Sequence, residues 1–342
     1  MERPLLLLLL RFTSLWLLFS AFAINLAGSQ GVGVNYGMKG DNLPSPSQVI
    51  SLYKSRNITK LRLFDPDANA LSALKNSGIG VILGTYNEDL QSLAGDTSAA
   101  TSWVHTNVAP YASAVDFRCI DVGNEVIPGD SANYVLPAMR NIAAALHAAG
   151  FNIPVSTAVS TEVLGTSYPP SQGAFSNEAS QVLGPIISFL ASNGSPLLVN
   201  VYPYFAYSGN PGEVRLDYSL FTASGVVVQD GSLGYSNLFD AMVDSVYSAL
   251  ERLDGSGVDV VVSETGWPSA GGETGATVDN ARIYNNNLVK HVNKVAGTPK
   301  FPGKQLEVYM FAMFNEDQKP VGTERNFGMF YPDMTEVYHV DF

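Results

Sequence analysis

The sequence predicts a single (β/α)8 barrel, an α/β fold in which helices surround eight parallel strands. Short apolar runs recur along the chain, and helix-like stretches separate them. The length of 342 residues suits one such barrel. A doubly wound open sheet is the alternative, and it is less favoured because no glycine-rich dinucleotide fingerprint follows the first run.

Eight runs rich in β-branched and aromatic residues are the expected strands. Most of them are nearly continuous in apolar residues, as parallel strands buried on both faces are. In chain order they are residues 32–36, 61–64, 80–85, 119–123, 155–159, 197–202, 258–263 and 307–314.

The stretches between these runs carry helical patterns. The clearest has Leu238, Met242, Val246 and Leu250 at four-residue spacing, which places them on one helix face. The expected helices are residues 47–55, 69–77, 98–108, 132–149, 176–192, 237–253 and 277–295. No Ser/Pro-rich linker divides residues 30–342, so we expect them to form one domain.

The first 29 residues are expected to be a secretory signal peptide. Arg3 precedes a long apolar run, and Ala27-Gly28-Ser29 is a small-residue cleavage site. A membrane anchor is the alternative, but Arg11 interrupts the run and no charged stop-transfer block follows. We therefore predict secretion to the extracellular space in preference to the vacuole, with no lipid anchor and with an N-glycan at the Asn57-Ile58-Thr59 sequon.

Composition excludes several classes of protein. A hydrophobic content of 46% with 15% charged residues argues against disorder. The net charge of −12 repels phosphate backbones, so no nucleic-acid partner is expected. The single cysteine, Cys119, excludes an intramolecular disulfide and a cysteine-rich zinc site, and we expect it to pack as a small hydrophobe. The predicted protein is a monomer without cofactor or metal.

Acidic residues follow three of the expected strands. Glu125 comes directly after the fourth run and Glu264 directly after the seventh, while Glu316 follows the eighth with Lys319 as a potential partner. The carboxyl ends of barrel strands carry the active site in this fold. A structural ion pair is the simplest reading of one such Glu, but three on one rim favour catalysis.

Aromatic residues crowd the same rim. Two carboxyl groups beside aromatic platforms fit glycoside hydrolysis, because one acid can protonate the leaving oxygen while an ionised partner attacks or activates water. About half of these aromatics are expected to be core residues instead. The set is Tyr36, Tyr86, Tyr202, Tyr204, Phe205, Trp267 and Phe314.

Several segments resemble glycoside hydrolase family 17. The two that resemble its signatures are Val122-Gly123-Asn124-Glu125 and Ser263-Glu264-Thr265-Gly266-Trp267-Pro268-Ser269. Further matches lie at residues 198–205, 314–316 and 327–330, so the resemblance covers essentially all of residues 30–342. Within the family the sequence is most similar to secreted plant endo-1,3-β-glucanases, a pathogenesis-related group that includes allergens.

The resemblance implies a retaining endo-hydrolase that acts on 1,3-β-glucans such as callose, fungal wall glucan and laminarin. Glu125 then matches the family's acid/base and Glu264 its nucleophile, and Asn124 matches the residue that bonds the sugar 2-hydroxyl. The other implied substrate-binding residues are Tyr36, Tyr202, Phe205, Trp267, Glu316 and Lys319. Lys319 is also expected to help keep Glu264 ionised.

The sequence departs from the family pattern at Asn35, where many members have Cys, and at Asp317, where Asn is usual. Neither change removes a catalytic group. Three rival functions stay open. A 1,3-1,4-β-glucan hydrolase would use the same catalytic residues, whereas a non-enzymatic glucan-binding protein would not require both carboxylates. A metal-dependent hydrolase is disfavoured because the chain has four His and no His-Glu-x-x-His segment.

Overall fold

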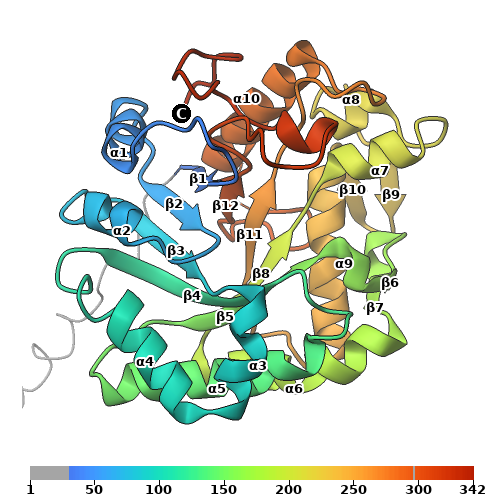
Figure 1. Ribbon diagram of the computed structural model, residues 1–342. Coiled ribbons are helices and arrows are strands. Elements are labelled where there is room, and N and C mark those ends of the chain that lie inside the picture. The colour runs from blue at the N-terminus through green and yellow to red at the C-terminus, as the bar shows by residue number, and fades with distance from the viewer. Residues whose placement is uncertain (1–30, 296) are drawn as a thin grey trace, which may run out of the picture. The chain divides into compact units, whose positions relative to one another are not determined.

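Eight parallel strands close into one barrel in the computed structural model, which describes residues 31–295 and 297–342 (Figure 1). Going round the barrel, the strands follow the order β1-β12-β11-β8-β5-β4-β3-β2. This order is the chain order of the barrel strands, so each strand pairs with its sequence neighbour through a crossover. The predicted (β/α)8 fold is confirmed. The predicted signal peptide lies outside the described residues.

All eight predicted strands are present, and their bounds differ by a few residues. The barrel strands are β1 Gly33–Tyr36, β2 Lys60–Leu63, β3 Gly80–Gly84, β4 Asp116–Asn124, β5 Val155–Ser160, β8 Leu197–Asn200, β11 Val260–Thr265 and β12 Glu307–Met310. The last one ends before the predicted Phe314. Beyond Met310 the chain leaves the ladder, because the backbone N–H of Ala312 donates to Phe327 and that of Met313 donates to Asn35.

Helices pack around the outside of the barrel, and α5, α6, α9 and α10 are the longest (Figure 1). Their bounds are α1 Pro46–Ser55, α2 Ala68–Leu74, α3 Leu90–Gly95, α4 Thr97–Asn107, α5 Ala132–Ala148, α6 Asn177–Asn193, α7 Pro203–Gly209, α8 Leu216–Ser219, α9 Leu238–Arg252 and α10 Val278–Lys294. The Asn237 side chain caps α9 by accepting from the backbone N–H of Asp240. No helix among residues 31–295 and 297–342 is long and apolar enough to cross a membrane.

The strands are buried on both faces, as their continuous apolar runs predict. The larger core cluster lies between strands and helices, and a smaller one forms where strand side chains meet inside the barrel. Cys119 belongs to the smaller cluster with Ile82 and Tyr309. It is a free, buried thiol, and burial raises its pKa, so it packs as the predicted small hydrophobe.

Two small antiparallel hairpins lie outside the barrel on the side of α9 (Figure 1). One pairs β6 Leu164–Thr166 with β7 Ala174–Phe175, and the other pairs β9 Val228–Asp230 with β10 Leu233–Tyr235. The sequence did not predict them, because strands of two or three residues are too short to show a periodic pattern. Their importance is positional, since residues from both hairpins reach the cleft described next.

Candidate active site

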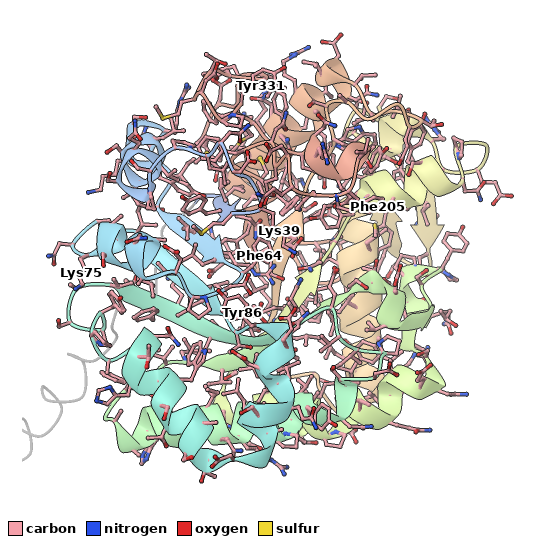
Figure 2. The ribbon with its side chains drawn as sticks, viewed as in Figure 1. Lys39, Phe64, Lys75, Tyr86, Phe205 and Tyr331 are labelled. Carbon is pink, nitrogen blue, oxygen red and sulfur yellow. The ribbon has the colours of Figure 1, made fainter. Side chains whose placement is uncertain are left out.

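A cleft of about 1650 Å³ opens at the carboxyl ends of the barrel strands. Its wall receives at least one residue from the carboxyl end of each of the eight strands, from Tyr36 at the end of β1 to Phe311 after β12. Figure 2 labels Tyr86, Phe64, Lys39 and Phe205 around this opening. The predicted site is therefore at the end of the barrel where this fold carries its chemistry.

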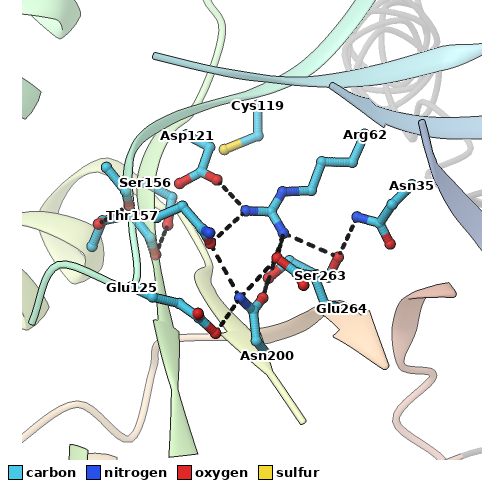
Figure 3. A network of polar contacts seen from close by, with 12 residues as sticks. Asn35, Arg62, Cys119, Asp121, Glu125, Ser156, Thr157, Asn200, Ser263 and Glu264 are labelled. Atoms are coloured by element: carbon cyan, nitrogen blue, oxygen red, sulfur yellow. Dashed lines mark hydrogen bonds and ion pairs between the residues drawn. The ribbon is translucent and has the colours of Figure 1, made fainter. Parts of the chain in front are cut away.

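Glu125 and Glu264 meet at one amide group. The Asn200 side-chain nitrogen donates to Glu125 Oε1 at 2.8 Å and to Glu264 Oε1 at 2.9 Å (Figure 3). Asn200 ends β8, which lies next to both β5 and β11 in the barrel. The two carboxylates, separated by 139 positions in the chain, are thus placed on either side of a shared donor.

Glu125 extends from an unusual backbone position. Its φ is 55°, in the left-handed region that non-glycine residues rarely adopt, and it follows Gly123 with a φ of 86°. This turn ends β4 and aims the Glu125 side chain into the cleft, where it lines the wall. Desolvation in the cleft raises the pKa of Glu125, and the Glu264 charge adds to the rise, while the Asn200 hydrogen bond opposes it.

Glu264 lies inside β11, where the pairing register with β8 shifts between Val262 and Glu264. Its side chain accepts from three donors: Oε1 from Arg62 at 2.7 Å and from Asn200, and Oε2 from the Tyr202 hydroxyl at 2.7 Å. Burial raises the pKa of Tyr202, so its hydroxyl stays a donor. Both oxygens of the Glu264 carboxyl group therefore accept hydrogen bonds from fixed donors.

Arg62 is the cation in contact with Glu264. It lies on β2 with no exposed surface, and its other amino group donates to Asp121 Oδ2 at 2.7 Å and to Asn124 Oδ1 at 2.9 Å. Burial alone would lower the pKa of Arg62, but the charges of Asp121 and Glu264 outweigh it and raise that pKa. We expected Lys319 to be the cation near Glu264. This expectation needs correction, because Arg62 occupies that position.

Lys319 is paired elsewhere in the cleft. Its ammonium lies 3.4 Å from Glu316 Oε2, 4.0 Å from Glu324 Oε2 and 4.0 Å from the centroid of the Phe311 ring. Glu316 also accepts from the backbone N–H of Lys39 at 2.8 Å. Glu316 packs directly against Gly37, where any side chain would collide with it. Glu316 and Lys319 both line the cleft, but neither has a hydrogen bond or ion pair with Glu125 or Glu264.

The rim aromatics divide between cleft and core. Tyr36, Tyr86, Tyr202 and Phe205 line the cleft, whereas Tyr204, Trp267 and Phe314 do not. Phe205 is 43% exposed and presents a free face, while Tyr36 borders the cleft with only 1% of its surface exposed. Tyr202 and Phe205 pack together with ring centroids 5.2 Å apart.

Trp267 does not bind substrate from this position, which corrects the expectation. It has no exposed surface, and its indole N–H donates to the Gly275 carbonyl at 2.8 Å. The ring packs against Tyr204, with centroids 5.1 Å apart, and Tyr204 in turn packs against Phe205. Trp267 therefore supports the wall behind the cleft.

Three residues of the centre were not predicted as site residues from the sequence: Arg62, Asp121 and Asn200. Each is a polar residue directly between two apolar neighbours, as in Leu61-Arg62-Leu63 and Leu198-Val199-Asn200-Val201. That interruption is the signal that could have found them, because a buried polar group needs a partner. Among residues 31–295 and 297–342, no group of three or more His, Cys, Asp or Glu side chains is placed to hold a metal.

Comparisons with known proteins agree with this geometry. The model of the family described as Glycosyl hydrolases family 17 matches residues 32–342. A relative from Hordeum vulgare is 62% identical over 319 residues, which cover 93% of this chain and 98% of the relative. A Vitis vinifera protein named glucan endo-1,3-beta-glucosidase is 56% identical over 322 residues, 92% of each chain.

A solved structure gives the same result for the fold. CJP38, a beta-1,3-glucanase and allergen of Cryptomeria japonica pollen, superposes with a TM-score of 0.89 at 46% sequence identity. The match covers 91% of this chain and 99% of that one. Both the sequence and the arrangement of elements are therefore shared with these proteins over nearly the whole barrel.

Proposed function

Since the chain belongs to family 17 of the glycosyl hydrolases, we propose that it hydrolyses internal 1,3-β-glucosidic linkages in 1,3-β-glucans such as callose, fungal wall glucan and laminarin. The relatives named for this activity share about half or more of its residues. The open cleft, with the exposed aromatic residues Tyr86 and Phe205 on its wall, suits a chain of neutral sugars.

The shared Asn200 donor is the observation that carries the mechanism. Two oxygens that accept from one nitrogen at 2.8 and 2.9 Å lie closer together than the roughly 6.5–9.5 Å that separates the carboxyl groups of inverting enzymes. Inverting enzymes use the larger separation to hold a water between their carboxyl groups. The shorter spacing of Glu125 and Glu264 supports a double displacement in which the β configuration is retained.

In the first step, a Glu264 oxygen attacks the anomeric carbon and forms an ester. The glycosidic C–O bond breaks, and its electron pair leaves with the oxygen, which takes the Glu125 proton. In the second step, Glu125 takes a proton from water, the water oxygen bonds to the anomeric carbon, and Glu264 regains its electron pair. The raised pKa of Glu125 supports its role as the acid.

Asn124 is proposed to bind the sugar 2-hydroxyl. Its side-chain oxygen accepts from Arg62 at 2.9 Å and from Asn200 at 3.1 Å, so the amide group is oriented with its nitrogen as the remaining donor. Phe205, Tyr202 and Tyr36 are proposed to contact sugar faces. Glu316 and Lys319 are proposed to bind sugar hydroxyls further along the cleft.

A comparison of two polymers tests the substrate class. The protein is expected to release oligosaccharides rapidly from laminarin and slowly from barley 1,3-1,4-β-glucan, with no change when a chelator is added. Faster cleavage of the mixed-linkage polymer would make that polymer the substrate. Binding of laminarin without any cleavage would contradict the enzymatic assignment, and loss of activity in the chelator would indicate a metal-dependent reaction.

We also propose that residues 1–29 direct secretion to the extracellular space and that Asn57 carries an N-glycan. Asn57 is exposed, in a tight turn between α1 and β2. After expression in a secretory host, the protein recovered from the culture medium is expected to begin near Gln30 and to lose mass on endoglycosidase treatment. The Asn57→Gln variant is expected to show no such loss of mass. Retention of the leader or an intracellular product would contradict the proposal.

A further inference from the structure

One buried guanidinium is shared by two carboxylates. Arg62 donates to Glu264 through one amino group and to Asp121 through the other, both at 2.7 Å (Figure 3). Arg62 is 0% exposed and Asp121 is 2% exposed. Neither residue lines the cleft, so Asp121 reaches the reaction only through Arg62.

The proposed reaction changes the charge on one side of Arg62 only. When the glycosyl ester forms, Glu264 turns from an anion into a neutral acyl group, and the negative charge appears on Glu125 after its proton has left. A buried guanidinium that loses its counterion is costly, because it has no water to compensate for the missing charge. Asp121 is placed to prevent that loss, since it stays outside the chemistry.

Asp121 also affects the free enzyme. With both carboxylates present, Arg62 divides its charge between them. Without the charge of Asp121, the full guanidinium charge would stabilise Glu264 as an anion and lower its reactivity towards the anomeric carbon. Both effects raise the barrier to ester formation, and neither raises the barrier to ester hydrolysis, in which Glu264 regains its charge.

We propose that Asp121 is a positioning residue for this reaction: it is the permanent counterion of Arg62, and it selectively accelerates formation of the glycosyl ester on Glu264. The inference rests on the proposed function and deepens it. If it holds, the rates of the two steps depend differently on the Asp121 side chain. A purely structural role of Asp121 would affect both steps alike.

The two steps can be measured separately with 2-deoxy-2-fluoro-β-laminaribiosyl fluoride. In this probe the anomeric C–F bond breaks, fluoride leaves with the electron pair, and the Glu264 ester accumulates. The rate of activity loss reports ester formation. After excess probe is removed, the rate of activity recovery with laminaribiose as acceptor reports ester breakdown.

In Asp121→Asn, which removes the charge and keeps the shape, we expect inactivation to be about ten- to a hundredfold slower. Recovery is expected to be as fast as in the wild type or faster, and the affinity for laminarin oligosaccharides unchanged. Asp121→Glu keeps the charge and is expected to keep the wild-type ratio of the two rates. Should the Asn variant not fold, Asp121→Ser removes the same charge, and the same asymmetry is expected.

Glu307→Gln is the matched control. Glu307 also pairs with an arginine, accepting from Arg118 at 2.6 and 2.9 Å, but at the start of β12 instead of its carboxyl end. This variant is expected to leave both rates unchanged. Equal slowing of both steps in the Asp121 variants, or no slowing of inactivation, would overturn the inference. Failure of the wild-type enzyme to be labelled at Glu264 would instead overturn the proposed function.

Discussion

At the scale of single residues, Asn200 organises the centre. Its amide nitrogen donates to both carboxylates and to Asn124, while its oxygen accepts from the Ser263 hydroxyl at 2.7 Å. These contacts fix the orientation of the amide without reference to substrate. The spacing of Glu125 and Glu264 is therefore a property of the free protein, and binding does not have to create it.

Replacing the proposed nucleophile tests its role directly. Glu264→Gln keeps the size of the side chain and removes the charge that attacks the anomeric carbon. Turnover of laminarin is expected to fall by about 10⁴-fold or more, while the melting temperature and glucan binding stay close to those of the wild type. Steady-state kinetics and thermal unfolding measure this. Near-normal turnover would exclude Glu264 as the nucleophile.

Replacing the proposed acid/base has a different signature. Glu125→Gln removes the proton donor, so natural glucans with poor leaving groups are cleaved very slowly. Aryl glycosides with good leaving groups are expected to retain part of their activity, and added azide to increase it further with a β-glycosyl azide as product. Product analysis by mass spectrometry and NMR checks this. If neither substrate nor azide rescues the variant, the acid/base assignment is wrong.

At the scale of elements, helix α9 carries a buried acid that the proposed reaction does not use. Asp244 has no exposed surface and accepts from the Tyr235 hydroxyl at 3.0 Å, from the Lys300 backbone N–H at 2.9 Å and from the Thr298 hydroxyl. It ties α9 to the β9–β10 hairpin and to the segment after α10. Burial raises the pKa of Asp244 to about 6, although these hydrogen bonds act in the opposite direction.

This raised pKa predicts a pH-dependent stability. The native state binds the proton more tightly than the unfolded chain, so the contribution of Asp244 is greatest below its ordinary pKa of 3.8 and is lost as the pH rises through about 6. The free energy of unfolding of the wild type, relative to Asp244→Asn, is expected to fall by up to roughly 3 kcal/mol between pH 4 and pH 7. Denaturant titrations at several pH values measure it, and parallel pH curves for the two proteins would contradict it.

Barrel elements were predictable because their burial leaves a pattern in the sequence. A strand such as 80–84, buried on both faces, must be apolar throughout, and α9 shows its inner face at four-residue spacing. The β6–β7 and β9–β10 hairpins have no such pattern, because their pairing depends on the barrel and α9 beside them. The contribution of these hairpins to the cleft wall was therefore not predictable.

The site was predictable where its residues follow the predicted apolar runs and unpredictable where they lie within those runs. Glu125 and Glu264 follow apolar runs, so the fold itself indicates that they are neighbours. Arg62 and Asp121 lie inside runs, and their meeting depends on how β2 and β4 are arranged around the barrel. Trp267 was predicted wrongly for a different reason: an aromatic residue three positions after Glu264 in the sequence can point away from the cleft and belong to the core.

At the scale of the whole molecule, the negative net charge of this protein is compatible with a neutral polysaccharide as its proposed substrate. The net charge of −12 repels polyanions, whereas a β-glucan carries no charge to be repelled. Part of that acidity lines the cleft, where Lys319 pairs with Glu316, and the buried Arg62 pairs with Glu264 from outside the cleft wall. The single cysteine is free and buried, so the stability of the described barrel comes from its packed core.

The configuration of the first product is a direct test of the double displacement, because it depends on the separation of Glu125 and Glu264 and on both of their proposed roles. Laminarin oligosaccharides can be hydrolysed in an NMR tube and the anomeric protons recorded before mutarotation. The double displacement predicts that the newly formed reducing ends appear first in the β configuration and convert slowly to the equilibrium mixture. Initial appearance of the α configuration would mean inversion, and it would contradict the mechanism that the shared Asn200 donor supports.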